Sequence, residues 1–186
     1  MSSKKSFIQQ YWREKKMVGA ISPSSPFLAE KMLEHIDFKN STVLVEIGPG
    51  TGVFTKRIIE KMNSETTLLV FELNKEFYDA LQLEISDQRV IFINDSAEKL
   101  ESYLIEYSFS KVDYIISSLP LSNFPQRITL KLLRTFQRAL IAHGKFIQFQ
   151  YSLKQKRELE HVFSKVSISF TPLNIPPAFV YTCGGS

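Results

Sequence analysis

The chain has 186 residues, of which 44% are hydrophobic and 23% charged, so it can form one globular domain with a proper core. Its apolar runs are far shorter than a membrane-spanning helix, and residues 1–16 are too polar for a secretory signal. The single cysteine, Cys183, excludes an internal disulfide and fits a reducing compartment, which makes the cytoplasm the expected location.

The net charge of +4 is concentrated in the first 20 residues. Of the 23 Lys and Arg and the 19 Asp and Glu residues, five and one lie in that segment, which leaves 18 of each in the rest of the chain. A basic leader on a neutral domain suggests an acidic partner, either a membrane surface or a nucleic acid. A frayed and solvated N-terminus explains the same charges, so charge alone leaves both interpretations open.

Strand-like and helix-like segments alternate after residue 40, which predicts an α/β fold with a mostly parallel central sheet and helices on both faces. Ahead of the sheet, helices are predicted over residues 5–18 and 26–35, the second with Ser24 and Ser25 as capping residues and Pro26 in its first turn. The predicted strands are residues 42–47, 67–72, 90–94, 112–117, 145–150, 166–170 and 178–182. The predicted helices between them are residues 53–61, 75–85, 125–142 and 154–164.

The helix predicted over residues 5–18 carries an apolar stripe edged with basic residues. The stripe spans roughly 140 degrees of the helical wheel; Arg13 and Lys16 lie outside it, and Lys15 lies within it, where it would have to snorkel. Aromatic side chains bordered by Lys and Arg are typical of a helix in the membrane interface. A helix packed onto the domain itself is the alternative. The stripe consists of Phe7, Ile8, Tyr11, Trp12 and Val18.

A glycine-rich turn, Glu46-Ile47-Gly48-Pro49-Gly50-Thr51-Gly52, lies between the first strand and the next helix. Nucleotide-binding turns have this context, because glycines permit the tight turn and let the backbone approach a ligand. The spacing departs from the pyrophosphate fingerprint, and the Glu46 carboxylate suits a positive group better than a diphosphate. Glu72 ends the second strand twenty residues after Gly52, where an acid binds ribose hydroxyls, and Asp95 follows the third strand, where an adenine edge would lie.

Residues 45–52 (VEIGPGTG) resemble motif I of the class I methyltransferases, which bind S-adenosylmethionine. The resemblance extends over residues 42–182 and implies a Rossmann-like methyltransferase domain over residues 41–186. Residues 1–40 would then be an N-terminal helical segment that caps the cofactor site. Glycines that only make a tight turn are the alternative. The cofactor-binding residues implied are Ser24 and Ser25 near the methionine end, Glu46 at the amino-acid part, Ile47, Gly48, Gly50, Thr51 and Gly52 in the turn, Glu72 and Leu73 at the ribose, Asp95, Ser96 and Ala97 at the adenine, and Ser117.

Residues 118–121, Ser118-Leu119-Pro120-Leu121, follow the fourth strand and look like a variant of the acceptor motif of amino-group methyltransferases. In that motif proline fixes the loop so that neighbouring carbonyls accept the hydrogens of the amine and aim its lone pair at the methyl group. Adenine methylases follow the proline with an aromatic residue that stacks on a flipped base. Here that residue is Leu121, which cannot stack. A strand-end turn that merely contains proline is the alternative.

Two families within this class resemble the chain. Ribosomal RNA adenine dimethylases share the turn over residues 46–52 almost residue for residue. They normally carry Tyr or Phe at the position of Leu121, where this sequence has leucine. They also normally carry a C-terminal helical domain that binds RNA, which we do not expect here. Small bacterial phospholipid N-methyltransferases, which methylate phosphatidylethanolamine towards phosphatidylcholine, resemble residues 18–25 (VGAISPSS), 118–125 and 176–178 (PPA). Ser118 departs from the Gly that many members carry, which would narrow the acceptor pocket.

The sequence therefore favours an S-adenosylmethionine-dependent N-methyltransferase that acts on a phospholipid headgroup amine at the inner face of the membrane. An adenine methylase of ribosomal RNA and a non-catalytic S-adenosylmethionine-binding module remain the alternatives. The expected partners are an anionic membrane surface and the lipid substrate, whereas nucleic acid is not expected. Catalytic candidates are Ser118, Leu119, Pro120 and Tyr151, and substrate or membrane contacts are expected from Phe7, Tyr11, Trp12 and Leu121.

Three further features of the sequence bear on function. Tyr151, after the fifth strand, is either a hydroxyl or cation–π partner of the acceptor or a core residue. A basic row on the helix over residues 125–142 is either a solvated face or a surface toward lipid headgroups. The three histidines show no ligand spacing, so no metal is expected. The basic row consists of Arg127, Lys131, Arg134 and Arg138, and the histidines are His35, His143 and His161.

Overall fold

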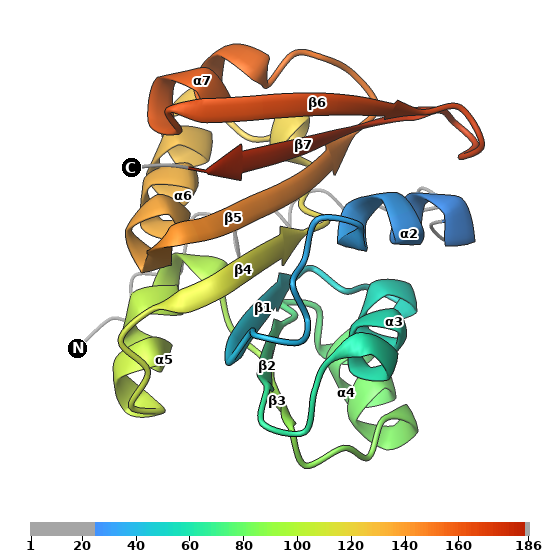
Figure 1. Cartoon of the computed structure of the whole chain (residues 1–186), viewed down its shortest axis with the longest axis vertical. Coiled ribbons are helices and arrows are strands. Elements are labelled where there is room, and N and C mark those ends of the chain that lie inside the picture. The colour runs from blue at the N-terminus through green and yellow to red at the C-terminus, as the bar shows by residue number, and fades with distance from the viewer. Residues whose placement is uncertain (1–24, 185–186) are drawn as a thin grey trace.

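The computed structural model of the chain describes residues 25–184, which form a layered α/β fold around one sheet (Figure 1). Seven strands lie in the order β3-β2-β1-β4-β5-β7-β6. The strands from β3 to β5 run parallel, and β7 lies antiparallel between β5 and β6. The predicted Rossmann-like, mostly parallel sheet is therefore confirmed. The strands are β1 (Val43–Ile47), β2 (Thr67–Phe71), β3 (Val90–Ile93), β4 (Val112–Ser117), β5 (Leu140–Gln150), β6 (Lys165–Thr171) and β7 (Ala178–Gly184).

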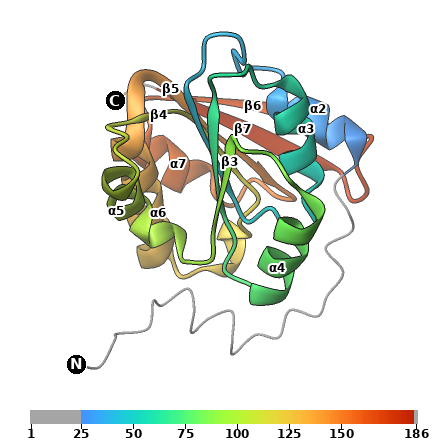
Figure 2. The same ribbon diagram turned by 90° about the horizontal axis from the view of Figure 1, so that it is seen from below.

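Helices cover both faces of the sheet, with α2, α3 and α4 on one side and α5, α6 and α7 on the other (Figure 2). Alternation along β1 produces two cores, because Val45 points into one and Leu44 into the other. Phe136 of α6 packs in the first core and Phe54 of α3 in the second. The helices are α2 (Pro26–Leu33), α3 (Val53–Lys61), α4 (Lys75–Glu84), α5 (Leu100–Glu106), α6 (Gln126–Ala139) and α7 (Lys156–Val162).

The prediction that one helix runs over residues 125–142 is wrong at its carboxyl end. Helix α6 stops at Ala139, and β5 starts at Leu140, which pairs with Val112 of β4. The apolar residues after Ala139 are compatible with either a helix or a strand. Pairing with β4 makes their backbone extended. Gly144 lies within β5. A Cβ atom there would lie 2.8 Å from the carbonyl oxygen of Asp113, so the close approach of β4 requires glycine.

The sequence pattern predicts no helix between residues 94 and 112, where the structure has α5. This helix has only 7 residues, and two of its apolar side chains, Leu100 and Leu104, are buried one turn apart. Ile105 is apolar but 79% exposed, which blurs the periodicity. A helix this short offers too few positions for the pattern to be distinguished from a loop.

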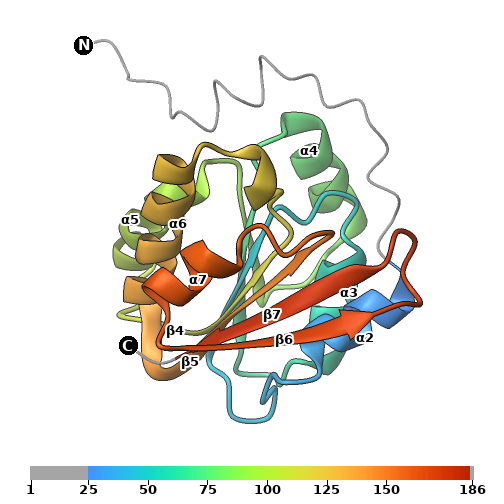
Figure 3. The same ribbon diagram turned by 90° about the horizontal axis from the view of Figure 1, so that it is seen from above.

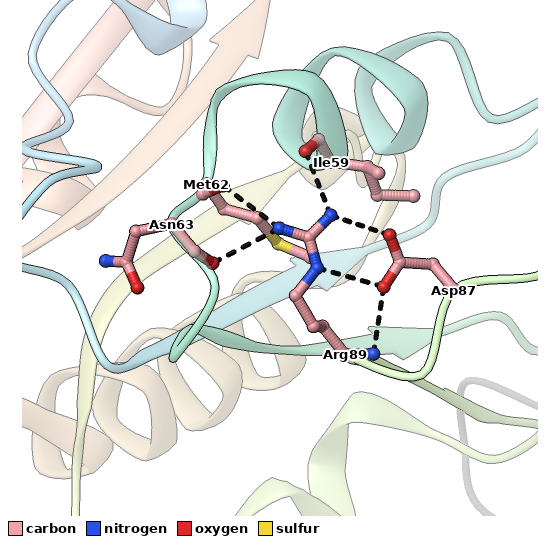
Figure 4. A network of polar contacts seen from close by, with 5 residues as sticks. All are labelled: Ile59, Met62, Asn63, Asp87 and Arg89. Carbon is pink, nitrogen blue, oxygen red and sulfur yellow. Dashed lines mark hydrogen bonds and ion pairs between the residues drawn. The ribbon is translucent and has the colours of Figure 1, made fainter.

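Arg89, just ahead of β3, fastens the carboxyl end of α3 (Figure 4). Its guanidinium donates hydrogen bonds of 3.0 to 3.4 Å to the backbone carbonyls of Ile59, Met62 and Asn63. Asp87 holds the same guanidinium through hydrogen bonds of 3.0 and 2.6 Å. Because a cation stabilises the carboxyl end of a helix, this network fixes α3, whose first turn follows the glycine-rich turn.

The connection between β6 and β7 projects past the amino end of α2 (Figures 1 and 3). Ser25 caps α2, since its hydroxyl oxygen accepts from the amide of Leu28 at 3.2 Å. The Ser25 amide in turn donates to Oδ1 of Asn174 in that connection, at 3.1 Å. The start of α2 is thereby tied to the β6–β7 hairpin. Within residues 25–184, no helix is long and apolar enough to cross a membrane.

Candidate active site at the carboxyl edge of the sheet

The predicted site residues gather where the carboxyl ends of β1, β2 and β4 meet. The chain places β2 and β3 on one side of β1 and β4 and β5 on the other. Such a reversal of strand order opens a crevice beyond the strand ends, which is where α/β folds bind ligands. Two backbone hydrogen bonds of 2.9 Å set the loops at this point, from the Gly48 amide to the Phe71 carbonyl and from the Ser118 amide to the Ile47 carbonyl.

The three glycines of the turn all have positive φ, at 69°, 56° and 77° for Gly48, Gly50 and Gly52. They differ in what a side chain would meet. A Cβ atom on Gly50 would meet nothing within 4 Å, so this glycine borders open space. On Gly48 it would lie 3.4 Å from the Leu119 side chain, and on Gly52 only 2.5 Å from that of Leu81. Gly50 thus leaves room beside the turn, as the predicted cofactor site requires, whereas Gly52 lets α3 pack against α4.

Glu46, the fourth residue of β1, is fully buried. Strand alternation places it on the same face as Leu44, toward α3, where an apolar side chain would ordinarily complete the core. Neither carboxyl oxygen makes a hydrogen bond with any residue that the structure describes, and the same holds for the buried Thr55 hydroxyl of α3. Burial raises the pKa of Glu46 to about 8; the Thr55 hydroxyl and amide lie close enough to oppose this rise in part without forming a well-aligned hydrogen bond, and the Glu72 carboxylate adds to the rise.

Glu72 follows β2 directly and is 7% exposed. One carboxylate oxygen accepts from the Gly50 amide at 3.1 Å, and the other accepts from the Asn74 amide at 2.7 Å. Burial raises the pKa of Glu72 although these backbone hydrogen bonds lower it. The acid is therefore tied to the glycine-rich turn and retains lone pairs for further donors.

Asp95, after β3, accepts hydrogen bonds from the Ser96 amide (2.7 Å), the Lys99 ammonium (2.6 Å) and the Tyr103 hydroxyl (3.0 Å). Burial alone would raise the pKa of Asp95, but these three donors together lower it. A carboxylate has about four lone-pair positions, so one remains for an outside donor. Ser96 and Ala97 are buried beside it and begin a short 3₁₀ turn.

This set of groups fits S-adenosylmethionine, the cofactor that the sequence resemblance implies. A buried acid without a partner suits a cationic amino-acid moiety, and a second acid at the turn suits ribose hydroxyls. Apart from Gly50 and its two chain neighbours, no atom of residues 25–184 lies within 4 Å of the point where a Cβ on Gly50 would be, so nothing in this part of the chain blocks the approach of a ligand to the turn. Of the other predicted cofactor residues, Ile47 and Ser117 are buried at the strand ends, Leu73 is half-buried, Thr51 is exposed, and Ser24 lies outside the described residues.

The acceptor loop is held by two glutamines that the sequence reading missed. The Leu119 carbonyl accepts from Nε2 of Gln148 and from Nε2 of Gln150, both at 3.0 Å. Gln148 also donates to the Phe149 carbonyl, so its amide nitrogen faces two acceptors and its orientation is fixed. Both glutamines are buried, and the Gln148 oxygen has no partner within residues 25–184. Two polar residues at i and i+2 in the apolar, buried second half of β5, residues 146–150, were the available signal.

The residues of the acceptor motif differ in burial and in hydrogen bonding. The Ser117 hydroxyl accepts from the Leu119 amide at 3.3 Å, and the buried Ser118 hydroxyl has no partner in the described chain. The Leu121 side chain is 0% exposed and belongs to the first core, so the expectation that it contacts the membrane is wrong. Leu121 instead fills the volume under the loop. Leu119 is also buried and its carbonyl already accepts from the two glutamines, so the Ser118 hydroxyl is the group that we predict to bind an acceptor.

Tyr151 lies at the mouth of this edge, directly after β5. The residue is 46% exposed, and its ring packs edge-on against the ring of Phe149, with the two ring centroids 5.6 Å apart. The core alternative for Tyr151 is therefore wrong, while a contact with the acceptor remains a prediction.

The basic row on α6 lies on the surface and is largely paired with neighbouring helices. Lys131 contacts Glu98 at 3.0 Å, and Arg138 contacts Glu101 of α5 at 2.9 Å. These pairs support the solvated-face interpretation. Among residues 25–184, no group of three or more His, Cys, Asp and Glu side chains is arranged to hold a metal ion. Phe7, Tyr11 and Trp12 lie outside the described residues.

Comparison with known proteins matches residues 3–155 to the family model described as ribosomal RNA adenine dimethylase. An ornithine lipid N-methyltransferase of Singulisphaera acidiphila is 26% identical over 181 residues, which cover 96% of this chain and 94% of that protein. Ribosomal RNA small subunit methyltransferase A of Ureaplasma parvum serovar 3 is 25% identical over 170 residues, which cover 88% of this chain but 58% of the relative.

Solved structures share the fold. Human methyltransferase-like protein 13 in complex with SAH superposes with a TM-score of 0.65 over 86% of this chain and 80% of the other. The two sequences are 13% identical, so this likeness concerns the architecture alone.

We expect Gly50→Val to abolish S-adenosylmethionine binding in a folded protein, because the added side chain projects into the space beside the turn. The matched change Gly52→Ala should instead lower the melting temperature, since its Cβ meets Leu81. Titration calorimetry and thermal unfolding separate the two effects. Unchanged cofactor affinity in folded Gly50→Val would refute the assignment of this space to the cofactor.

We expect Glu46→Gln to stabilise the cofactor-free protein and to weaken S-adenosylmethionine binding. A carboxyl whose pKa is raised on folding disfavours the folded state increasingly as pH rises from about 4.5 to about 8. The penalty that glutamine removes is roughly 3 kcal/mol at pH 7. Urea unfolding at pH 5 and pH 7.5 measures it, and the gain should be larger at pH 7.5. A pH-independent difference together with unchanged cofactor affinity would contradict this account of Glu46.

We expect Gln150→Leu to slow turnover about tenfold at saturating cofactor, because the Leu119 carbonyl loses one of its two side-chain donors. Cofactor affinity should stay within about twofold of the parent value. Gln137→Leu is the matched control, since the Gln137 amide also donates to a carbonyl, that of Val162, but away from the site. Equal rates in the two variants would show that the glutamine clamp, the pair Gln148 and Gln150 on the Leu119 carbonyl, does not position the acceptor loop.

Proposed function

The chain belongs to the ribosomal RNA adenine dimethylase family and is an S-adenosylmethionine-dependent methyltransferase, and we propose that its acceptor is the headgroup amine of a membrane lipid. Phosphatidylethanolamine is the substrate that the sequence resemblance suggests. The ornithine lipid N-methyltransferase that aligns over 94% of its own length adds a second lipid with a headgroup amine. The chain spans 58% of the ribosomal RNA methyltransferase that it matches.

Leu121 is the observation that carries the proposal. An adenine methylase needs a flat side chain after the motif proline, because the flipped base is held by stacking. Leu121 has no ring, and its side chain is fully buried in the first core. An aliphatic primary amine needs no such stacking surface, only acceptors for its hydrogens and an aligned approach.

The residues at the carboxyl edge divide the work of methyl transfer. S-adenosylmethionine supplies an electrophilic methyl group on a sulfonium, so alignment is the main task of the protein. Glu46 would balance the positive amino-acid moiety of the bound cofactor, and Glu72 would bind its ribose hydroxyls beside Gly50. Gln148 and Gln150 hold the Leu119 carbonyl in place.

The acceptor must reach the site as a neutral amine, because an ammonium has no lone pair. In our proposal the buried Ser118 hydroxyl accepts one of the amine hydrogens and so helps to aim the lone pair. The exposed ring of Tyr151 offers a cation–π surface to an ammonium headgroup before its proton is lost. These two side chains would therefore select an amine at the mouth and orient it inside.

Membrane association is the second part of the proposal. The helix predicted over residues 5–18 carries the aromatic stripe and most of the excess positive charge of the chain. An anionic surface would attract each exposed Lys or Arg by about 1 kcal/mol. It would bring the lipid acceptor to the carboxyl edge of the sheet.

The proposal predicts that purified protein transfers labelled methyl groups from S-adenosylmethionine to vesicles that contain phosphatidylethanolamine or ornithine lipid. Vesicles of phosphatidylcholine alone and unmethylated small-subunit ribosomal RNA should stay unlabelled, and Gly50→Val serves as the cofactor-deficient control. Mass spectrometry of the extracted lipid identifies the product. Label in RNA adenine without label in lipid would overturn the proposal, and cofactor binding without any transfer would favour a non-catalytic module.

A further inference from the structure

The connection between β6 and β7 exposes apolar side chains and buries a polar one, which is the reverse of an ordinary water-exposed loop. Its residues 172–177 read PLNIPP, and no charged residue follows Lys165 in the chain. Leu173 is 62% exposed and Ile175 is 83% exposed, whereas Asn174 between them is 2% exposed. Soluble loops expose polar groups and bury apolar ones, so this arrangement requires an explanation.

Hydrogen bonds hold the loop in this arrangement. The Asn174 side chain accepts from the Ser25 amide at 3.1 Å and donates to the Pro176 carbonyl at 2.7 Å. Its polar group is therefore satisfied inside the protein, while the aliphatic side chains on either side of it, Leu173 and Ile175, are exposed. The exposed apolar tip is a built feature that α2 supports, not a frayed loop.

The tip lies at the same edge of the sheet as the candidate active site. Phe179, at the start of β7, pairs with Gln150 at the carboxyl end of β5. Figures 1 and 3 show the hairpin projecting beyond α2 at this edge. Six of the ten exposed large apolar side chains of the described residues belong to the segments that meet here. They are Phe27, Tyr151, Leu153, Phe170, Leu173 and Ile175.

Positive charge accompanies this apolar rim. Lys154, Lys156 and Arg157 are exposed in the segment that leads from β5 into α7, where Lys156 lies 3.6 Å from Glu160, and Arg127 is exposed in the first turn of α6. Exposed apolar side chains beside Lys and Arg are typical of surfaces that enter the headgroup region of an anionic bilayer. A protein partner would not require the apolar tip to stand at the acceptor entrance.

We propose that the β6–β7 hairpin inserts Leu173 and Ile175 into the lipid bilayer and so holds the carboxyl edge of the sheet against the membrane. This inference rests on the proposed lipid substrate and adds a second contact to the one predicted over residues 5–18. The hairpin would set the orientation of the domain on the bilayer. A lipid amine could then reach the Ser118 loop while its acyl chains remain in the membrane.

A local fluorescence probe tests the insertion directly. The only native cysteine, Cys183, is buried, and burial raises the pKa of its thiol to about 12, so an introduced cysteine labels selectively near neutral pH. Leu173→Cys, labelled with a polarity-sensitive fluorophore, should shift to shorter wavelength and lose iodide quenching on vesicles of 30% phosphatidylglycerol and 70% phosphatidylcholine. Leu83→Cys, at a 90% exposed position on α4, is the control and should not change. A water-exposed signal from position 173 on vesicle-bound protein overturns the inference.

Co-sedimentation of the full chain provides the second measurement. Leu173→Ser with Ile175→Ser should weaken vesicle binding at least about tenfold, and Leu83→Ser with Ile105→Ser should leave it unchanged. Cofactor affinity and melting temperature should match the parent in both. Lipid methylation by a hairpin variant that binds vesicles normally would remove the hairpin inference and leave the proposed function intact. No lipid methylation by the parent, with the fluorescence shift present, would do the opposite. A concentration-dependent dimer that the serine changes abolish would assign the tip to a second copy of the chain.

Discussion

The buried carboxyl group of Glu46 is the constraint around which this edge of the protein is organised. It occupies a core position in the central strand, where strand alternation calls for an apolar side chain. Folding places the group there without a hydrogen-bond partner in the described residues and raises its pKa to about 8. Such an arrangement costs stability in the free protein, and costs of this kind are common at functional sites.

The surrounding elements hold the glycine-rich turn and the acceptor loop in fixed positions around Glu46, where a ligand could bind it. The Gly50 amide is bound to Glu72, which couples the turn after β1 to the acid after β2. Arg89 fixes the far end of α3, so the helix that begins at the turn cannot drift. The two glutamines of β5 hold the acceptor loop on the other side of β1. The cofactor region and the acceptor region are therefore built on opposite sides of one strand.

The glycine-rich turn, the acid after β2 and the presence of the seven strands could be predicted because each depends on local sequence. Strand, glycines and helix fix the turn, and the acid follows at a characteristic spacing. The boundary between α6 and β5 could not be predicted, because pairing with β4 decides the state of the residues after Ala139. The glutamine clamp and the buried state of Leu121 depend on contacts between distant segments, which no local pattern contains.

The exposure of Leu173 and Ile175 was hidden for a similar reason. In the sequence the two residues lie in the proline-rich connection between the last two predicted strands, and only the structure shows that they are exposed while Asn174 is hydrogen-bonded to Ser25 and Pro176. Apolar residues are therefore a weak guide to the core near a hairpin that a distant helix supports. The buried acids of the candidate cofactor site and the exposed apolar tip of the hairpin thus lie at the same carboxyl edge of the sheet.

Proton release on cofactor binding tests the central claim most directly. Titration of the protein with S-adenosylmethionine at pH 6.5, in buffers that differ in ionisation enthalpy, measures the protons exchanged. Because Glu46 is protonated at this pH in the free protein and would ionise against a cationic ligand, we predict release of about one proton per bound cofactor. Glu46→Gln should abolish that release. Cofactor binding with no proton exchange, or with the same exchange in Glu46→Gln, would contradict the account.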